Sequence, residues 1–264
     1  MKRVFLAAAA IGGSLLVYER VIRPWWQTWG IDERDVGRPL PGDDLVPGAR
    51  TIDTRSVEID APPADVWPWL TQMGYGRAGW YSYDAIDMTG GSSRRIVPEW
   101  QSLAVGDVVP TYPGGGFEVR VVEPRQALVL YSDTTLVTRQ AEAAKRANTE
   151  PASANVEATG VMLGATQPSQ FAASWAFVLE PMAGDRTRLI ERFRVEFGES
   201  DKPWTALTLP VVGFGVFVMT QRQMLGIKER AETLRRERSM SVGSASDEET
   251  VRVEVSSTTA PAVS

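Results

Sequence analysis

Apolar and polar residues alternate from Thr54 to Ile59, and this period of two predicts a half-buried β-strand with Val57 and Ile59 facing inward. Residues 60–63, Asp-Ala-Pro-Pro, are expected to end the strand and begin a helix, because proline is tolerated in a first helical turn. The folded part of the chain is therefore predicted to open with a strand followed at once by a helix. The apolar stripe of that helix is formed by Val66, Trp67, Leu70 and Met73.

Short alternating stretches separated by turn residues continue through the rest of the chain. Gly114–Gly116 is expected to be a hairpin turn and not a phosphate-binding loop, since neither a helix nor a Lys-Ser/Thr pair follows it. Short strands joined by hairpins predict a curved antiparallel sheet. The clearest predicted strands are Val108–Thr111, Phe117–Glu123, Ala127–Tyr131, Ala172–Glu180 and Thr187–Phe197.

Residues 132–170 interrupt this pattern with a stretch rich in Ala, Thr, Glu, Ser and Gln. Such a composition predicts a mobile insertion in a hairpin, in which residues 141–147 are expected to form a short helix.

The last predicted element runs from Trp204 to about Arg238. It opens with an apolar run to Met219 that contains one proline and two glycines, and it then becomes amphipathic. This pattern predicts a long C-terminal helix, and a second membrane span is the alternative. Residues 239–264 are rich in Ser, Thr, Glu and Val and are predicted to be a disordered tail.

The N-terminal segment, residues 1–23, carries fifteen uncharged residues from Val4 to Tyr18 behind Lys2-Arg3. It predicts a membrane anchor formed by residues 4–22, and a cleaved signal peptide or a buried helix are the alternatives. The tryptophans at 25, 26 and 29 suit either a membrane interface or packing on the domain. Residues 24–50, rich in proline, glycine and charge, are predicted to be a linker.

The composition excludes several kinds of chemistry, because the 264 residues include no histidine and no cysteine. Ser-His-Asp and Cys-His catalysis, disulfides and the usual zinc ligands are therefore absent. A net charge of −5 and a pI near 5.1 argue against nucleic-acid binding. The acidic residues lack the spacing of a calcium loop, so no metal and no cofactor are expected.

Residues 57–70, Val-Glu-Ile-Asp-Ala-Pro-Pro-Ala-Asp-Val-Trp-Pro-Trp-Leu, resemble the opening strand, Ala-Pro step and Val-Trp helix of the Bet v 1/START-like superfamily. This superfamily is also called SRPBCC or polyketide cyclase/dehydrase-like. Further similarity lies in Val105-Gly106-Asp107 before a strand, the hairpin around Gly184, and the closing helix at 222–234.

The resemblance covers roughly Thr51 to Leu234 and implies an α+β helix-grip fold for a domain at 51–238. In that fold a curved antiparallel sheet wraps around a long C-terminal helix, with a cavity between them. Members of the superfamily bind lipids, sterols, polyketides or other apolar molecules, and some are cyclases or dehydratases.

Glu191 is the sharpest candidate for chemistry, because it falls in register with the apolar face of its strand, beside Leu189 and Phe193. An inward carboxylate would have a raised pKa and could act as a general acid or base. The alternative is a position near the strand end, paired with an arginine such as Arg94 or Arg120.

The aromatic loop at 74–83 supplies further candidates, since Tyr81 or Tyr83 could donate a proton and Arg77 could hold an anion. The alternative is a loop held to the sheet by its own rings. The residues predicted to line a ligand site are Trp80, Arg77, Asp84, Trp175, Phe177, Phe193 and Phe217.

Three functions are compatible with these observations. The first is a membrane-tethered, non-catalytic binding or carrier protein for a hydrophobic small molecule, held between the sheet and the helix at 211–234. The second is a cyclase- or dehydratase-type enzyme that uses Glu191, Tyr81 or Tyr83 for proton transfer. The third is an envelope scaffold whose aromatic loop contacts a protein partner. The basic residues on both sides of the anchor leave the side of the membrane undecided.

Overall fold

The computed structural model describes the chain except for residues 1–12, 14–15, 88–89, 148–169, 199–204 and 259–264, and it describes only the backbone of 86–87, 205–212 and 242–258. It is an α+β structure in which one six-stranded antiparallel sheet has the order β1-β6-β5-β4-β3-β2. The strands are β1 (Thr51–Ile59), β2 (Val108–Tyr112), β3 (Gly115–Glu123), β4 (Ala127–Asp133), β5 (Phe171–Met182) and β6 (Arg186–Phe197). All six contain a predicted strand, extended by a few residues at one or both ends.

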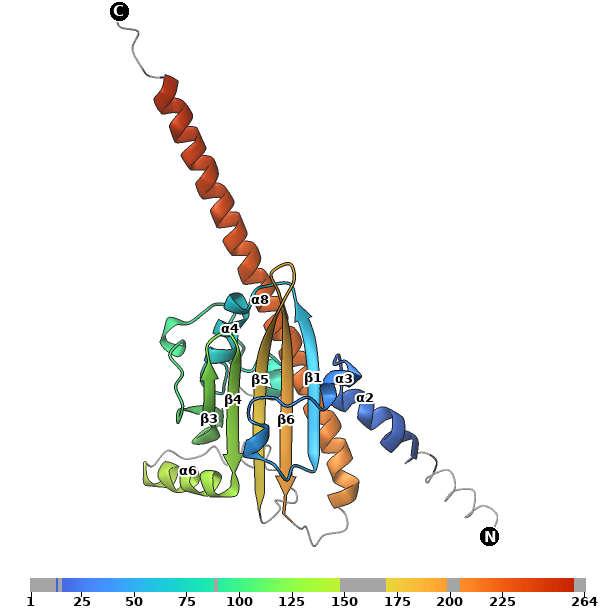
Figure 1. The fold of residues 1–264 in the computed structure, drawn as a ribbon. Helices are drawn as coiled ribbons and strands as arrows, with labels where there is room; N and C mark the ends of the chain where they lie inside the picture. The colour runs from blue at the N-terminus through green and yellow to red at the C-terminus, as the bar shows by residue number, and fades with distance from the viewer. Residues whose placement is uncertain (1–12, 14–15, 88–89, 148–169, 199–204, 259–264) are drawn as a thin grey trace, which may run out of the picture.

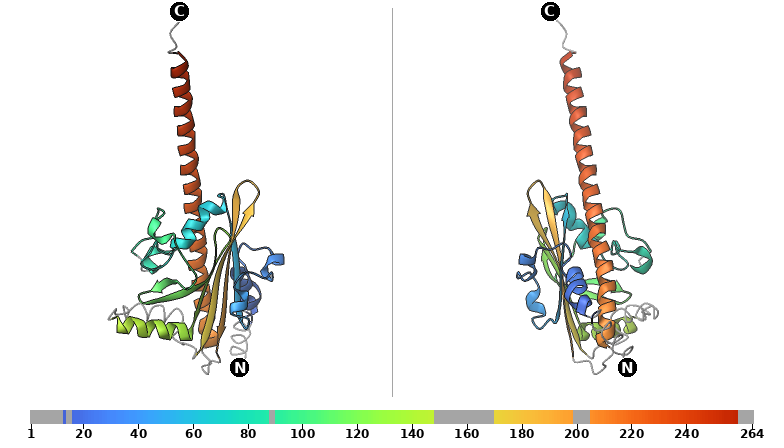
Figure 2. Two further views of the ribbon diagram at one scale, coloured as in Figure 1. Left: turned by 60° about the vertical axis from the view of Figure 1, so that its left-hand side comes forward. Right: turned by 90° about the vertical axis from the view of Figure 1, so that its right-hand side faces the viewer.

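The C-terminal helix α8 (Thr205–Thr258) crosses one face of the sheet, which curves around it (Figures 1 and 2). Helix α4 (Pro63–Gln72) packs against α8, and its Val66, Trp69, Leu70 and the following Met73 are buried. Trp67 of the predicted stripe is only partly buried, and Trp69 takes its place. The core lies between this inner face of the sheet and the two helices. The remaining helices are η1 (Tyr18–Ile22), α2 (Arg23–Gln27), α3 (Glu33–Val36), η2 (Asp43–Leu45), α5 (Asp84–Asp87), η3 (Pro98–Trp100) and α6 (Thr134–Arg146).

Residues 30–50 pack on the outer face of the sheet, although their composition predicts a linker. Arg192 of β6 points to this face and donates hydrogen bonds to the carbonyls of Val36 and Arg38. It also pairs with the carboxylate of Asp43, and Leu40 and Val46 are buried. The segment is therefore an integral part of the domain.

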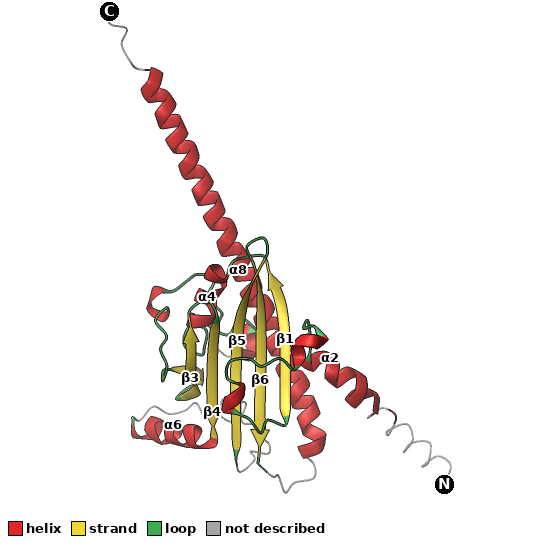
Figure 3. Cartoon of the chain, in the orientation of Figure 1, coloured by secondary structure: helices red, strands yellow, loops and turns green. Residues whose placement is uncertain are grey.

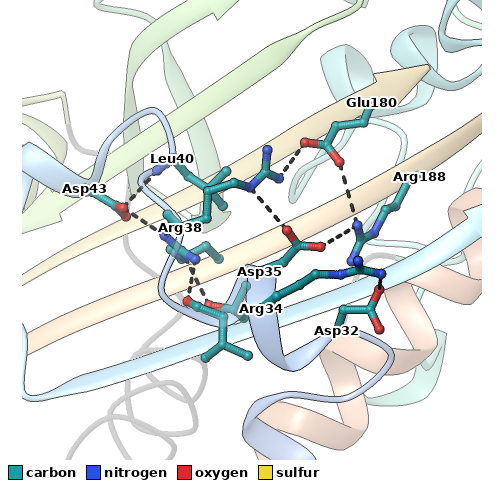
Figure 4. A network of polar contacts seen from close by, with 11 residues as sticks. Asp32, Arg34, Asp35, Arg38, Leu40, Asp43, Glu180 and Arg188 are labelled. Carbon is teal, nitrogen blue, oxygen red and sulfur yellow. Dashed lines mark hydrogen bonds and ion pairs between the residues drawn. The ribbon is translucent and has the colours of Figure 1, made fainter. Parts of the chain in front are cut away.

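Ion pairs fasten the start of this segment to β5 and β6 (Figure 4). Asp35 lies 2.8 Å from the guanidinium of Arg188, and this hydrogen bond holds the pKa of Asp35 below its ordinary value. Arg38 pairs with Glu180 of β5.

Helix is more extensive than predicted in two regions, the insertion, where residues 141–147 were expected to be helical, and the C-terminal tail. Within the predicted insertion, α6 begins at Thr134, where the carboxylate of Asp133 accepts the backbone N–H of Leu136 at 2.7 Å and caps the first turn. Residues 148–169 of the insertion lie outside the described residues. The predicted tail continues α8 to Thr258 (Figure 3), and residues 239–258 contain no proline that would end the helix.

Most of the predicted anchor at 4–22 lies outside the described residues. Among the residues that are described, no helix is both long and apolar enough to span a membrane. The three adjacent tryptophans differ in burial. Trp26 is 3% exposed and packs near Phe217, and Trp29 is partly buried against the core. Trp25 is 57% exposed.

Candidate functional site

Three charged side chains occupy inward positions of β1 and β6, where the sheet faces α8. Arg55 lies directly opposite Glu191, and Asp53 lies opposite Phe193. Arg55 and Glu191 are 0% exposed and Asp53 is 4% exposed. We call these three residues the buried charge cluster. Charged groups this deeply buried are costly unless they are paired and hydrogen-bonded.

Arg55 is the centre of the buried charge cluster. Its Nη1 lies 3.0 Å from Glu191 Oε2, and its Nη2 lies 2.7 Å from Asp53 Oδ2. Its Nε donates to the carbonyl of Trp26, and Nη1 also donates to Thr220 Oγ1. Because these partners come from α2, β1, β6 and α8, one guanidinium ties the N-terminal segment and the final helix to the sheet.

The two carboxyl groups share this single cation. Burial raises the pKa of Glu191 and also that of Asp53, and Arg55 opposes the shift in both cases. The second oxygen of Glu191 accepts the indole N–H of Trp175 at 2.8 Å, and the second oxygen of Asp53 accepts the side-chain amide of Gln27 at 2.9 Å. All four carboxyl oxygens therefore have a hydrogen-bond partner.

An aromatic cluster adjoins the buried charge cluster through Trp175. The ring of Trp80 stacks on Trp175 with centroids 5.4 Å apart. Phe117, Phe177 and Phe193 surround the same indole at 5.8, 5.1 and 6.2 Å. Phe177 is fully buried and Trp80 nearly so, whereas Trp175, Phe117 and Phe193 are only partly buried. Apolar ring surface thus remains accessible on the inner face.

The rest of the interface between sheet and helix is filled. Met224, Ile227 and Ala231 of α8 are fully buried, as are Leu128 and Leu189 on the sheet. These side chains pack α8 against the middle of the sheet. Accessible apolar surface lies at the aromatic cluster. Within that cluster Trp175 lies beside Phe193 in the sheet, and Phe193 lies beside Asp53 of the buried charge cluster.

The predicted site residues divide between two regions. Trp80, Trp175, Phe177 and Phe193 gather in the aromatic cluster with Glu191, and the Phe217 ring lies 5.5 Å from the guanidinium of Arg55. The other predicted residues, on or beside the aromatic loop, serve different contacts.

Arg77 donates to the carbonyls of Thr71 and Trp100, and therefore holds the loop to the fold. The Tyr81 hydroxyl donates to the carbonyl of Trp69, and burial raises its pKa. Asp84 accepts both the backbone N–H and the hydroxyl of Ser92.

Tyr83 is exposed, and no hydrogen bond or ring contact joins it or Tyr81 to Glu191 within the described part of the chain. Glu191 does pair with an arginine, as the alternative expected, but the arginine is Arg55, and Glu191 lies in the middle of β6 and not near its end. Arg120, one of the two arginines suggested, pairs with Glu118. No three acidic side chains among the described residues are placed to hold a metal ion.

Sequence reasoning missed Arg55 and Asp53. The signal was present, because the alternation that turns Ile59 and Val57 inward also turns Arg55 and Asp53 inward. The alternation does not say that an inward arginine meets an inward glutamate, because that pairing depends on the register of β1 against β6.

Glu191 should make the stability of the protein fall as pH rises. A carboxyl group whose folded pKa is raised stabilises the fold fully below its ordinary value near 4.5, and this contribution is lost as pH rises toward the folded value. Glu191→Gln removes the titration, so the variant should gain stability relative to the parent between pH 4.5 and 8.

Urea unfolding of both proteins across this range measures the effect. Replacing the carboxyl group with an amide also changes the free energy of unfolding by an amount that does not depend on pH. That amount cancels when the difference between the two proteins is compared from one pH to another. Parallel stability curves would contradict a raised pKa at Glu191.

Comparison with known proteins gives no identity. No family model matches the chain, and no curated protein sequence matches it. Among solved structures, protein MLL2253 of Mesorhizobium loti is similar at 19% identity over 70% of this chain and 97% of that chain, with a TM-score of 0.32. Protein jhp0584 of Helicobacter pylori is similar at 11% identity over 73% and 95%, with a TM-score of 0.39. DynU16, encoded in the dynemicin biosynthetic locus, is similar at 15% identity over 66% and 45%, with a TM-score of 0.28. Similarity this low identifies neither a family nor a function.

Proposed function

We propose that the protein binds a small apolar molecule containing rings, against the aromatic cluster on the inner face of the sheet. The observation that carries the proposal is Trp175, which four other rings surround while its own surface remains partly accessible. Aromatic pairs contribute about 0.5–1.5 kcal/mol beyond simple burial. Small-molecule sites are typically apolar with a few fixed polar groups, and here Glu191 holds the central indole in place.

Binding without catalysis is favoured over a cyclase or dehydratase. Both oxygens of Glu191 are already engaged by Arg55 and Trp175. A general acid or base needs hydrogen-bond reach to the substrate, directly or through one water. Glu191 is completely buried, so it fits an orienting role better than a reacting one.

The sheet curved around α8 supports the Bet v 1/START-like resemblance, and we include membership of that superfamily and its helix-grip fold in the proposal. We also keep residues 4–22 as a membrane tether. The support for the tether is the uncharged run behind Lys2-Arg3 and the exposed Trp25 that follows it.

An uncharged fluorescent probe, N-phenyl-1-naphthylamine, tests the binding proposal. We expect saturable binding of one probe per chain, with energy transfer from tryptophan. Trp175→Leu should weaken binding by up to about tenfold, since it removes stacking worth about 0.5–1.5 kcal/mol. The matched control is Trp25→Leu, which changes an exposed tryptophan outside the aromatic cluster. Equal affinities in the two variants, with both folded, would refute the site.

A further inference from the structure

A hollow lies between residues 81–84 and 92–96 on one side and one face of α8 on the other, with a volume of about 800 Å³. Its α8 wall runs from Arg222 to Glu237, a length of about 22 Å. Trp69 and Tyr81 also line it, and so do the apolar side chains of Ile96 and Leu234. We call this hollow the arginine groove, because Arg94, Arg95, Arg222 and Arg230 all line it.

The charges of the arginine groove do not cancel. Three acidic residues line it with the four arginines. Glu229 is occupied by Arg222, with Oε1 and Nη1 2.9 Å apart, and Asp84 accepts two hydrogen bonds from Ser92. Glu237 lies at the far end of the helix wall. Arg94 and Arg95 form no side-chain hydrogen bond or ion pair among the described residues, and four arginines against three carboxylates leave the groove with one excess positive charge.

Arg230 is the most constrained cation of the groove. Its Nε donates to the carbonyl of Ser93 and its Nη1 to the carbonyl of Gly226. Its guanidinium lies 4.6 Å from the centroid of the Tyr81 ring. Within the described residues no carboxylate pairs with it and its Nη2 has no acceptor. Burial lowers the pKa of Arg230, as expected for a partly desolvated cation whose charge is not matched by an ion pair.

Two donors behind the wall of the groove lack acceptors. The indole N–H of Trp69 and the hydroxyl of Ser82 are buried from solvent, and neither has a hydrogen-bond partner in the part of the chain described. An unmet buried donor costs about 1–3 kcal/mol. The backbone of Tyr81 between them has φ of 61°, an uncommon value for a residue with a side chain, and such strain often occurs at binding sites.

We propose that the arginine groove binds a small amphipathic anion, with a phosphate or carboxylate head at Arg230 and Arg94 and an apolar body against Ile96 and Leu234. A head with several acceptor oxygens can accept hydrogen bonds from two guanidinium groups at once. This site is separate from the aromatic cluster and goes beyond the function proposed above.

Calorimetric titration of the full chain with octyl phosphate tests the site, with octanol and inorganic phosphate as the two partial ligands. Octyl phosphate should bind at least tenfold more tightly than inorganic phosphate, and octanol should not bind measurably. Arg230→Gln should weaken octyl phosphate at least tenfold. Arg139→Gln is the control, because it removes the same charge from an exposed position on α6. Cosedimentation with phosphatidate vesicles in excess of that with phosphatidylcholine vesicles, which would report the tether at 4–22 alone, distinguishes a lipid head group from a free anion as the natural source.

Two further variants keep the test decisive. Arg230→Gln removes bonds to two backbone carbonyls and so risks unfolding, whereas Arg94→Gln changes an exposed residue and should weaken octyl phosphate about threefold at unchanged thermal stability. Trp175→Leu should leave octyl phosphate binding unchanged, which separates failure here from failure of the aromatic site. The proposal is overturned if octyl phosphate does not bind the folded chain. It is also overturned if both Arg94→Gln and a folded Arg230→Gln bind like Arg139→Gln.

Discussion

Replacing Arg55 with methionine is expected to lower the free energy of unfolding by about 3–5 kcal/mol, because removing one partner leaves the other buried charges uncompensated. Asp53 and Glu191 would then face each other's charge without the cation that both contact at 3.0 Å or less. The carbonyl of Trp26 would also lose its buried donor. Urea unfolding at pH 7 measures the loss.

Two comparisons show whether charge is the cause. Arg188→Met removes an arginine from the outer face of the same sheet, where the ion pairs are partly exposed, and should cost only about 1 kcal/mol or less. Adding Asp53→Asn and Glu191→Gln to Arg55→Met removes the uncompensated charge and should recover at least about 2 kcal/mol. If the triple variant is no more stable than Arg55→Met, the loss comes from packing and the electrostatic explanation is wrong.

Gly226→Ala is expected to lower the free energy of unfolding by about 1–3 kcal/mol, although alanine is the better helix former. A Cβ atom at this position would lie 2.1 Å from the carbonyl oxygen of Tyr81, which is backbone and cannot rotate away. The loop around Tyr81 would have to move off α8. Thermal or urea unfolding measures the cost, and octyl phosphate binding should weaken with it, because Tyr81 lines the arginine groove.

Gly215→Ala is the matched control on the same helix. A Cβ there would meet nothing within 4 Å, so the variant should gain up to about 1 kcal/mol from helix propensity. If both variants are stabilised, the loop does not depend on close contact with α8 at Gly226.

The strands and the final helix could be predicted from sequence because they depend on local periodicity. Alternation located β6 to within a residue, and the amphipathic stretch after Met219 located the part of α8 that packs on the sheet. Glu191 could be assigned to the inner face for the same reason.

The partners of Glu191 could not be predicted, because Arg55 is distant in sequence and meets it only through strand register. The packing of residues 30–50 was missed for a similar physical reason. Arg192 holds that segment through the backbone carbonyls of Val36 and Arg38. Every residue has a backbone carbonyl, so the residue types do not show which carbonyls accept a hydrogen bond. The arginine groove was equally hidden, since Arg94 and Arg230 come together only when the loop packs on Gly226.

Native mass spectrometry of the full chain, followed by organic extraction and identification of the released material, tests the central claim that the protein binds an apolar ring-containing molecule. We expect about one such molecule per chain in the parent and in Trp25→Leu, and loss of that molecule in Trp175→Leu. A folded chain that carries no such molecule, and takes up none from a panel of lipids and polycyclic compounds, would contradict the claim and favour the envelope scaffold.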